Sequence, residues 1–194
     1  MKIEIKISEP LLNQVTKDLI RPHEFAFERV GFLFTRIGKI TAKKTLLLFT
    51  DYMSVPDNYY LNDPDVGARI SGDAIRAVMQ RILNTKEGAF HVHMHHYFPN
   101  FSLGFSRVDQ QGIGRMIQSF QAAGPTLPHG AFLYDSKRYL ADVLMPCGKQ
   151  FIRAKKITVV GFPTQIYKEK QKCQKIDTID NRSLAIKAYS QNVQ

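Results

Sequence analysis

Hydrophobic and polar residues alternate in several short stretches of the chain, as in residues 2–7, where lysine and glutamate alternate with isoleucine. This period of two is typical of β-strands that bury one face. Other stretches, such as residues 71–84, place apolar residues three and four positions apart, which is typical of amphipathic helices. The order of the two patterns predicts a single α/β domain with a mixed sheet flanked by helices. We expect strands at residues 2–7, 31–38, 44–51, 89–96, 130–134, 139–144 and 156–161, and helices at residues 9–20, 71–84 and 109–122.

Three segments follow neither period. Residues 25–30 are ambiguous and could end a second helical segment. Residues 52–68 contain two prolines and several aspartates and asparagines, so we expect an insert or long loop over the sheet. After the last strand the chain becomes polar and rich in lysine and glutamine. We therefore expect a domain at residues 1–163 and a basic C-terminal extension at residues 164–194.

The composition is that of an ordinary globular protein, with 44% apolar and 23% charged residues. No apolar run approaches the roughly 20 residues of a membrane-spanning helix. The two cysteines, Cys147 and Cys173, are far apart and lie outside any CxxC motif, so we expect a cytoplasmic protein. The net charge of +10 favours acidic partners, but no nucleic-acid motif accompanies it. Neither a membrane nor nucleic acid is therefore an expected partner.

Four of the six histidines fall between His91 and His96. In a strand, residues two apart point to the same side, so His91, His93 and His95 share one face. Two such imidazoles and a carboxylate from the next element make an open site for a divalent metal. A Ser-x-x-Asp sequence, Ser106 to Asp109, follows the histidines and supplies that carboxylate.

These residues resemble the signature of the JAMM metalloproteases, which have JAB/MPN domains. That signature is His-x-His (here His93 and His95) followed by Ser-x-x-Asp, with an upstream Glu-x-x-Gly-apolar-Leu that Glu28 to Leu33 matches in the expected order. The resemblance covers residues 20–145. It implies a JAB/MPN-like (cytidine-deaminase-like) mixed sheet and a deubiquitinase-like isopeptidase of the prokaryotic type.

The resemblance also implies a role for each residue. His93, His95 and Asp109 would bind Zn²⁺, with water as the fourth ligand. Glu28 would accept a proton from this water and pass it to the leaving amine, and Ser106 would hydrogen-bond the oxyanion. The implied reaction is cleavage after the C-terminal tail of a ubiquitin-like protein, either in a conjugate or in a precursor. E1- and E2-like enzymes are the other partners that the family suggests.

Alternatives remain open at three of these positions. His91 and His93 could be the ligand pair instead, because they have the same spacing as His93 and His95. Glu24 and Ser102 are rivals for Glu28 and Ser106, although Glu24 lacks a glycine three residues later and Ser102 lacks an aspartate.

The sequence also departs from the family at two points. His96 stands where the family usually has proline, and the interval from His95 to Asp109 is longer than the common spacing. A non-catalytic MPN-type scaffold is the alternative function. A metal-dependent nuclease is a more distant one, favoured only by the charge.

Overall fold

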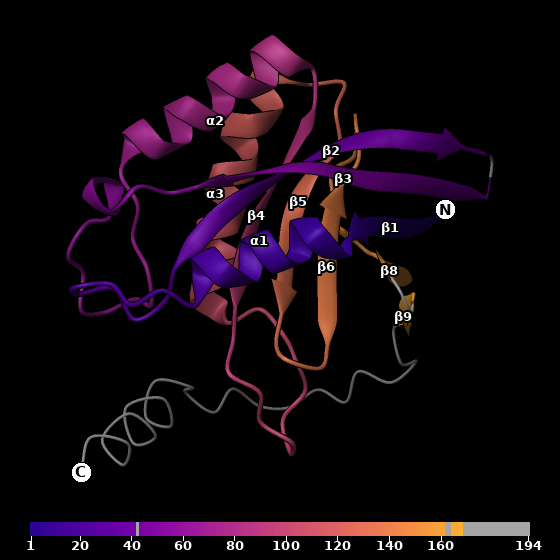
Figure 1. Ribbon diagram of the computed structural model, residues 1–194. Helices are drawn as coiled ribbons and strands as arrows, with labels where there is room; N and C mark the ends of the chain where they lie inside the picture. The colour runs from indigo at the N-terminus through magenta and orange to yellow at the C-terminus, as the bar shows by residue number, and fades with distance from the viewer. Residues whose placement is uncertain (42, 162–163, 169–194) are drawn as a thin grey trace.

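The computed structural model describes residues 1–41, 43–161 and 164–168, which form one nine-stranded mixed sheet with three α-helices (Figure 1). The strand order is β7-β6-β5-β4-β2-β3-β1-β8-β9. The strands are β1 (Lys2–Ser8), β2 (Val30–Ile40), β3 (Lys44–Ser54), β4 (Gly88–Met94), β5 (His129–Tyr134), β6 (Tyr139–Leu144), β7 (Ile152–Arg153), β8 (Lys156–Val160) and β9 (Gln165–Lys168). The helices are α1 (Glu9–Leu19), α2 (Gly72–Thr85) and α3 (Arg107–Ala123), with a 3-10 turn η1 (Asp57–Tyr59).

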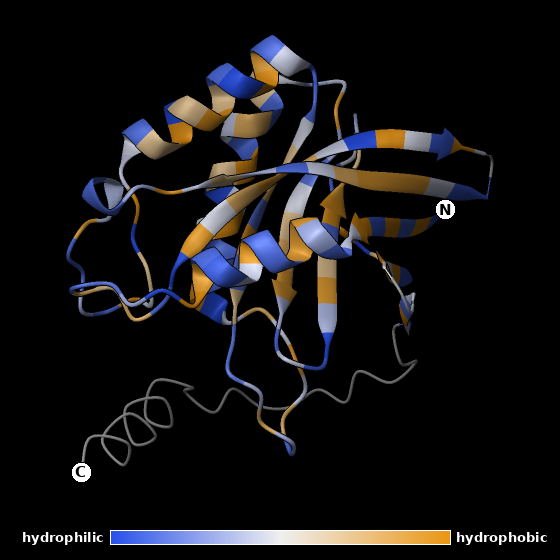
Figure 2. Cartoon of the chain, in the orientation of Figure 1, coloured by the Kyte–Doolittle hydropathy of each residue, from blue (hydrophilic) through white to orange (hydrophobic). Residues whose placement is uncertain are grey.

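The sheet separates two hydrophobic cores. On one face α1 packs its leucines and Val15 against β1 and the central strands, including Phe90 and Phe132. On the other face α2 and α3 cover Phe32 and Phe34 of β2 and the first half of β4. Figure 2 shows hydrophobic residues along the central strands, between α1 in front and α2 and α3 behind. The result is a three-layer α/β domain, as the sequence predicted.

Local sequence explains where α1 begins. Ser8 ends β1, and its hydroxyl accepts a hydrogen bond from Leu11 N at 3.4 Å, while Pro10 occupies the first turn. Leu11, Leu12, Val15 and Leu19 then share the buried face of the helix. The side chains of β1 alternate in burial because its isoleucines point toward α1.

The sheet curls around α1 until its two ends approach each other. Ala154 donates to Ala141 O of β6, and the next residue, Lys155, donates to Ile3 O of β1, so two residues join opposite ends of the strand order. The rings of Tyr139 and Tyr167, from β6 and β9, have centroids 4.3 Å apart. This curl places α1 in the concave face of the sheet.

Most of the expected elements are confirmed, with differences at their ends. The helix expected from Asp109 begins at Arg107, and the histidine strand ends at Met94. The possible helical piece at residues 25–30 is wrong: Val30 starts β2, and the preceding residues form bends.

The short strands β7 and β9 were not expected. β9 carries the sheet past residue 163, into the segment predicted to be the extension. The rest of that segment, 169–194, lies outside the described residues. No helix in the described part of the chain is long and apolar enough to cross a membrane.

Candidate metal centre

His91 and His93 lie on β4, in the middle of the sheet between β2 and β5, and His95 directly follows the end of this strand. Phe90 and Val92 point toward α1, so His91 and His93 point toward α2 and α3. β2 runs antiparallel to β4, with Val30 opposite His93. Continuing this register by two residues places Glu28 beside His95. The upstream glutamate and the histidines therefore meet through sheet pairing, although they are distant in the sequence.

Three ligand atoms form a compact triangle at this end of β4. His93 Nε2 lies 3.2 Å from His95 Nε2, and Asp109 Oδ2 lies 3.6 and 3.7 Å from these two nitrogens. A point equidistant from the three atoms is about 2.0 Å from each, within the range of zinc–nitrogen and zinc–oxygen bonds. Two imidazoles and one carboxylate also match the three-ligand sets of catalytic zinc sites. The three residues therefore fit a zinc ion in number and chemistry, and small shifts of the side chains would give the tetrahedral geometry that zinc prefers.

Helix α3 fixes the position of Asp109. Ser106 is the N-cap: its hydroxyl accepts from Asp109 N at 3.1 Å, while Asp109 Oδ2 accepts from Ser106 N at 2.8 Å. This reciprocal pair is a capping box, which satisfies two backbone donors at the start of a helix. The Ser-x-x-Asp spacing thus has a structural cause as well as a chemical one. The Ser106 hydroxyl accepts this bond through its oxygen and keeps one proton to donate.

Glu28 adds a second carboxylate to the group. Its carboxylate and the two imidazoles of His93 and His95 each offer an atom, and these atoms lie within 4.8 Å of one another. Glu28 N donates to Gly67 O at 3.0 Å, which ties the segment before β2 to the loop that follows η1. The site therefore has two carboxylates, one on α3 and one before β2.

Burial and charge set the protonation of these groups. Burial raises the pKa of Glu28, the charge of His93 opposes that rise, and Asp109 adds to it. Burial, followed by the charge of His93, lowers the pKa of His95 to about 4, so this imidazole is neutral at pH 7. Burial also disfavours the charged form of His93, but the hydrogen bond and charge of Asp109 outweigh it and raise the pKa of His93.

The pKa of Asp109 shifts in the opposite direction to that of His93. Burial raises its pKa, but hydrogen bonds from His93 and Ser106 outweigh burial and hold it well below the usual range. At neutral pH Asp109 is therefore an ionised carboxylate beside at least one neutral imidazole. Asp109 and His95 therefore have the protonation that metal ligands require, whereas His93, whose pKa is raised, would release its proton when a metal binds.

A scan of the chain against protein-family models finds no match, and a comparison with curated proteins finds none either.

The residues that the sequence left as alternatives lie outside the triangle of His93, His95 and Asp109. The His91 ring is 5.2 Å from that of His93, and its Nδ1 has no hydrogen-bond partner in the described part of the chain. Glu24 and Ser102 are exposed. His129, outside this group, is held between backbone groups: its Nδ1 accepts from Ala89 N, and its Nε2 lies 2.9 Å from Gly124 O.

Sequence reasoning missed the residues that hold Glu28 in place. Arg29 is only 3% exposed, and its guanidinium donates to the carbonyls of Arg21 and Pro22 and pairs with Asp57 at 2.7 Å. The Tyr60 hydroxyl bridges the backbone N and O of Val30. These contacts fix the irregular segment before β2. No sequence period marks them, because each joins residues that are seven or more positions apart in the chain.

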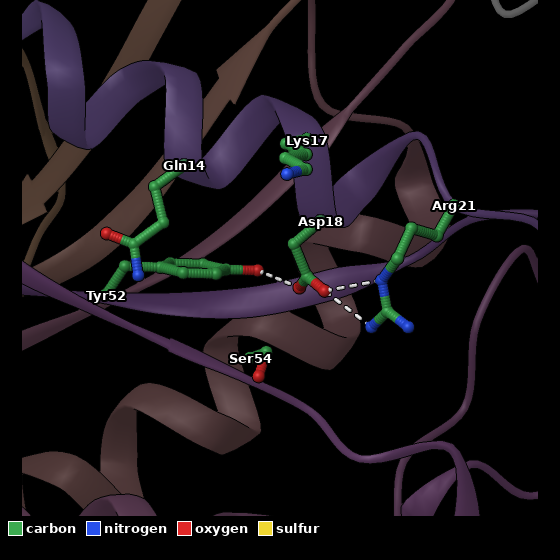
Figure 3. A pocket seen from close by; sticks show the side chains of 6 residues that line it. All are labelled: Gln14, Lys17, Asp18, Arg21, Tyr52 and Ser54. Carbon is green, nitrogen blue, oxygen red and sulfur yellow. Dashed lines mark hydrogen bonds and ion pairs between the residues drawn. The ribbon is translucent and has the colours of Figure 1, made fainter.

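Gly31, the glycine of the upstream motif, has a packing role. A Cβ at Gly31 would lie 2.2 Å from the Tyr52 hydroxyl, so only glycine lets this tyrosine cross β2. Figure 3 shows Tyr52 reaching Asp18, whose carboxylate accepts from the Tyr52 hydroxyl at 2.5 Å and also pairs with Arg21. A hollow of about 300 Å³ beside this pair lies next to α1, on the face of the sheet opposite the histidines. It is separate from the metal centre.

Proposed function

We propose that this chain is a zinc-dependent isopeptidase or peptidase of the JAMM type, which cleaves after the C-terminal tail of a ubiquitin-like modifier. The observation that supports this most directly is the triangle of His93, His95 and Asp109 with the Glu28 carboxylate beside it. A JAB/MPN-like (cytidine-deaminase-like) form of the fold belongs to the same proposal. Zn²⁺ is the cofactor, and the cytoplasm is the proposed compartment.

The residues divide the chemistry among them. His93, His95 and Asp109 would hold the metal, which when bound supplies a Lewis acid for amide hydrolysis. Glu28, in the role that the JAMM resemblance implies, takes a proton from the attacking water and delivers it to the leaving amine, while Asp109 serves as the carboxylate ligand. Ser106 donates its hydroxyl proton to the oxygen on which negative charge develops. Burial of Glu28 supports this role, since a raised pKa makes a carboxylate a stronger base.

Two loops support a peptide tail as the substrate. The loop between Met94 and α3 joins the ligands of β4 to Asp109, and the loop after η1 brings Gly67 onto Glu28. Both loops border the metal centre, and we propose that the tail binds between them. An extended tail can bind there through main-chain hydrogen bonds and present one carbonyl to the site. E1- and E2-like enzymes are proposed as further partners.

Metal content and cleavage, measured on the same preparation, test this proposal. Plasma mass spectrometry of the full chain should give about one zinc per protein, and His95→Ala should lose it. A ubiquitin-like protein with a fluorogenic amide at its C-terminus should be cleaved by the wild-type chain, and a chelator should stop the cleavage. Bound zinc with no cleavage of any tail-bearing probe would instead support a non-catalytic scaffold.

A further inference from the structure

The sheet carries a basic surface away from the metal centre. The registers align three rows of side chains across β2, β3, β1, β8 and β9, all on the face opposite α1. Six lysines stand in these rows, and we call them the basic sheet face: Lys2, Lys6, Lys39, Lys44, Lys156 and Lys168. Among the described residues of the three rows, the one carboxylate is that of Glu4, which pairs with Lys44 at 2.7 Å.

No helix covers this region in the described part of the chain. α2 and α3 pack against β4 and β5, and Figure 1 shows them on the side of the molecule away from β1, β8 and β9. All of the six lysines except Lys156, which is half-buried, are exposed. Apart from Lys44, they form no ion pair with a described residue. Their charges therefore act on the solvent without neutralisation by the fold.

Repulsion between lysines on this face is unfavourable when no partner is bound. Lys2 lies directly opposite Lys44, and Lys156 lies directly opposite Lys168. Like charges in such cross-strand positions destabilise a sheet. A bound anionic surface would remove this repulsion.

The spaces between the lysines are apolar. Leu46 and Leu48 are partly buried in the same rows, and Ile166 is 53% exposed. A hollow of about 170 Å³ is lined by Lys39, Lys44, Leu46 and Thr41. Lys39 is unpaired among the described residues, and Lys44, which pairs with Glu4, has further ammonium protons to donate, so a carboxylate placed beside Lys39 can be bound by both lysines above the Leu46 side chain.

We propose that the basic sheet face docks an acidic surface of a partner protein, with one partner carboxylate in the hollow between Lys39 and Lys44. A positively charged face attracts a complementary negative face of a partner, and the partly exposed aliphatic side chains among the lysines add apolar contact area. Single-stranded nucleic acid favours aromatic side chains for base stacking, and the described residues of these rows include none. The proposal is independent of the metal centre, because none of its residues belongs to β4 or α3.

Charge reversal on and off the face tests the proposal. We would compare Lys39→Glu/Lys156→Glu with the control Lys17→Glu/Lys149→Glu, whose lysines are exposed elsewhere and whose net charge changes equally. The probes are fluorescent poly-L-glutamate and an oligothymidylate of the same charge, each titrated with the full chain at low salt. The face variant should bind polyglutamate about tenfold more weakly than wild type, and the control less than about twofold. Wild type should bind oligothymidylate more weakly than polyglutamate.

Equal losses in the two variants would overturn the proposal, since net charge alone would then explain binding. Tighter binding of oligothymidylate that is lost in the face variant would also overturn it, in favour of a nucleic-acid surface. Amide chemical shifts of the wild-type chain give a test that needs no variant. Polyglutamate should shift residues 2–6, 39–44 and 156–160 and leave α1 and α2 unchanged. If the face variant binds as much zinc as wild type, its weaker binding of polyglutamate cannot be attributed to damage at the metal centre.

Discussion

Gly67 lies against the carboxylate of Glu28 so closely that a Cβ at Gly67 would be 2.9 Å from both Cδ and Oε2. A methyl group there must displace the carboxylate, because the Glu28 side chain is the movable partner. We therefore expect Gly67→Ala to lower turnover about tenfold or more while zinc content stays at the wild-type level, since a displacement on the ångström scale is costly in catalysis. Turnover and metal content of the purified variant would show this.

Gly112 offers the matched control, because no atom lies within 4 Å of a Cβ built there. It is in the middle of α3, where alanine is about 1 kcal/mol more favourable than glycine. Gly112→Ala should raise the free energy of unfolding and leave turnover unchanged. Equal turnover losses in the two variants would show that space around Glu28 is not the cause.

Replacing Glu28 by glutamine separates catalysis from metal binding. The amide keeps the shape of the side chain but cannot accept the proton, so turnover should fall about 10²- to 10⁴-fold with zinc retained. Glu24→Gln, at an exposed position four residues earlier, should change neither property. Loss of zinc in Glu28→Gln would assign Glu28 to the ligands instead.

Asp109 and Ser106 share one capping box but should give different phenotypes. In Asp109→Asn the side chain keeps an oxygen that can accept from Ser106 N, so we expect α3 to remain capped. Zinc affinity should fall more than about 100-fold, because losing a direct ligand costs more than losing a residue that only hydrogen-bonds to a ligand. Ser106→Ala should keep zinc, lower the free energy of unfolding by about 1 kcal/mol and reduce turnover about 10²-fold. Zinc titrations and thermal unfolding distinguish the two outcomes, and identical phenotypes would contradict the assignment.

His91 should make the metal-free protein sensitive to acid. Burial, with a smaller contribution from the charge of His93, lowers the pKa of His91 from 6.5 to about 3. The unfolded chain therefore takes up a proton near pH 6.5 while the folded chain does not, so stability falls as the pH falls through this window. At pH 5.5 the loss from this group is about 1.4 kcal/mol.

Urea unfolding of the metal-free protein at pH 7.5 and 5.5 measures this loss, and His91→Gln should remove it. His93, whose pKa is raised, contributes with the opposite sign in both proteins and cancels in the comparison. Parallel pH profiles for the two proteins would contradict the expectation.

The periodic parts of the fold could be predicted from the sequence. The alternating isoleucines of β1 and the apolar face of α2 each bury one side, and the periods of two and 3.6 record this directly. β7 and β9 lack such a period, because they are short edge strands whose side chains are half-buried or exposed. Residues 25–30 could not be assigned, because the ion pair and carbonyl contacts of Arg29 hold them in a shape that no propensity specifies.

In the candidate site, too, the relations set by regular secondary structure were predictable, and those set by loops were not. Spacing alone placed His93 and His95 on one face and Asp109 near a helix start, since strand and helix geometry determine these relations. The contact of Gly67 with Glu28 was not predictable, because it depends on the path of an irregular loop. Nor does the sequence reveal that β2 and β4 are neighbours, which brings Glu28 to the histidines.

The pairing of β1 with β8 determines when the sheet can be completed. Ile5, in the first strand, is the register partner of Ile157, so the two are joined across most of the chain. A ribosome must release nearly the whole domain before β1 gains its second neighbour, and until then one edge of β1 is open. Such long-range parallel pairing slows folding and exposes strand edges to other chains. We therefore expect slow refolding, with a yield that falls as protein concentration rises.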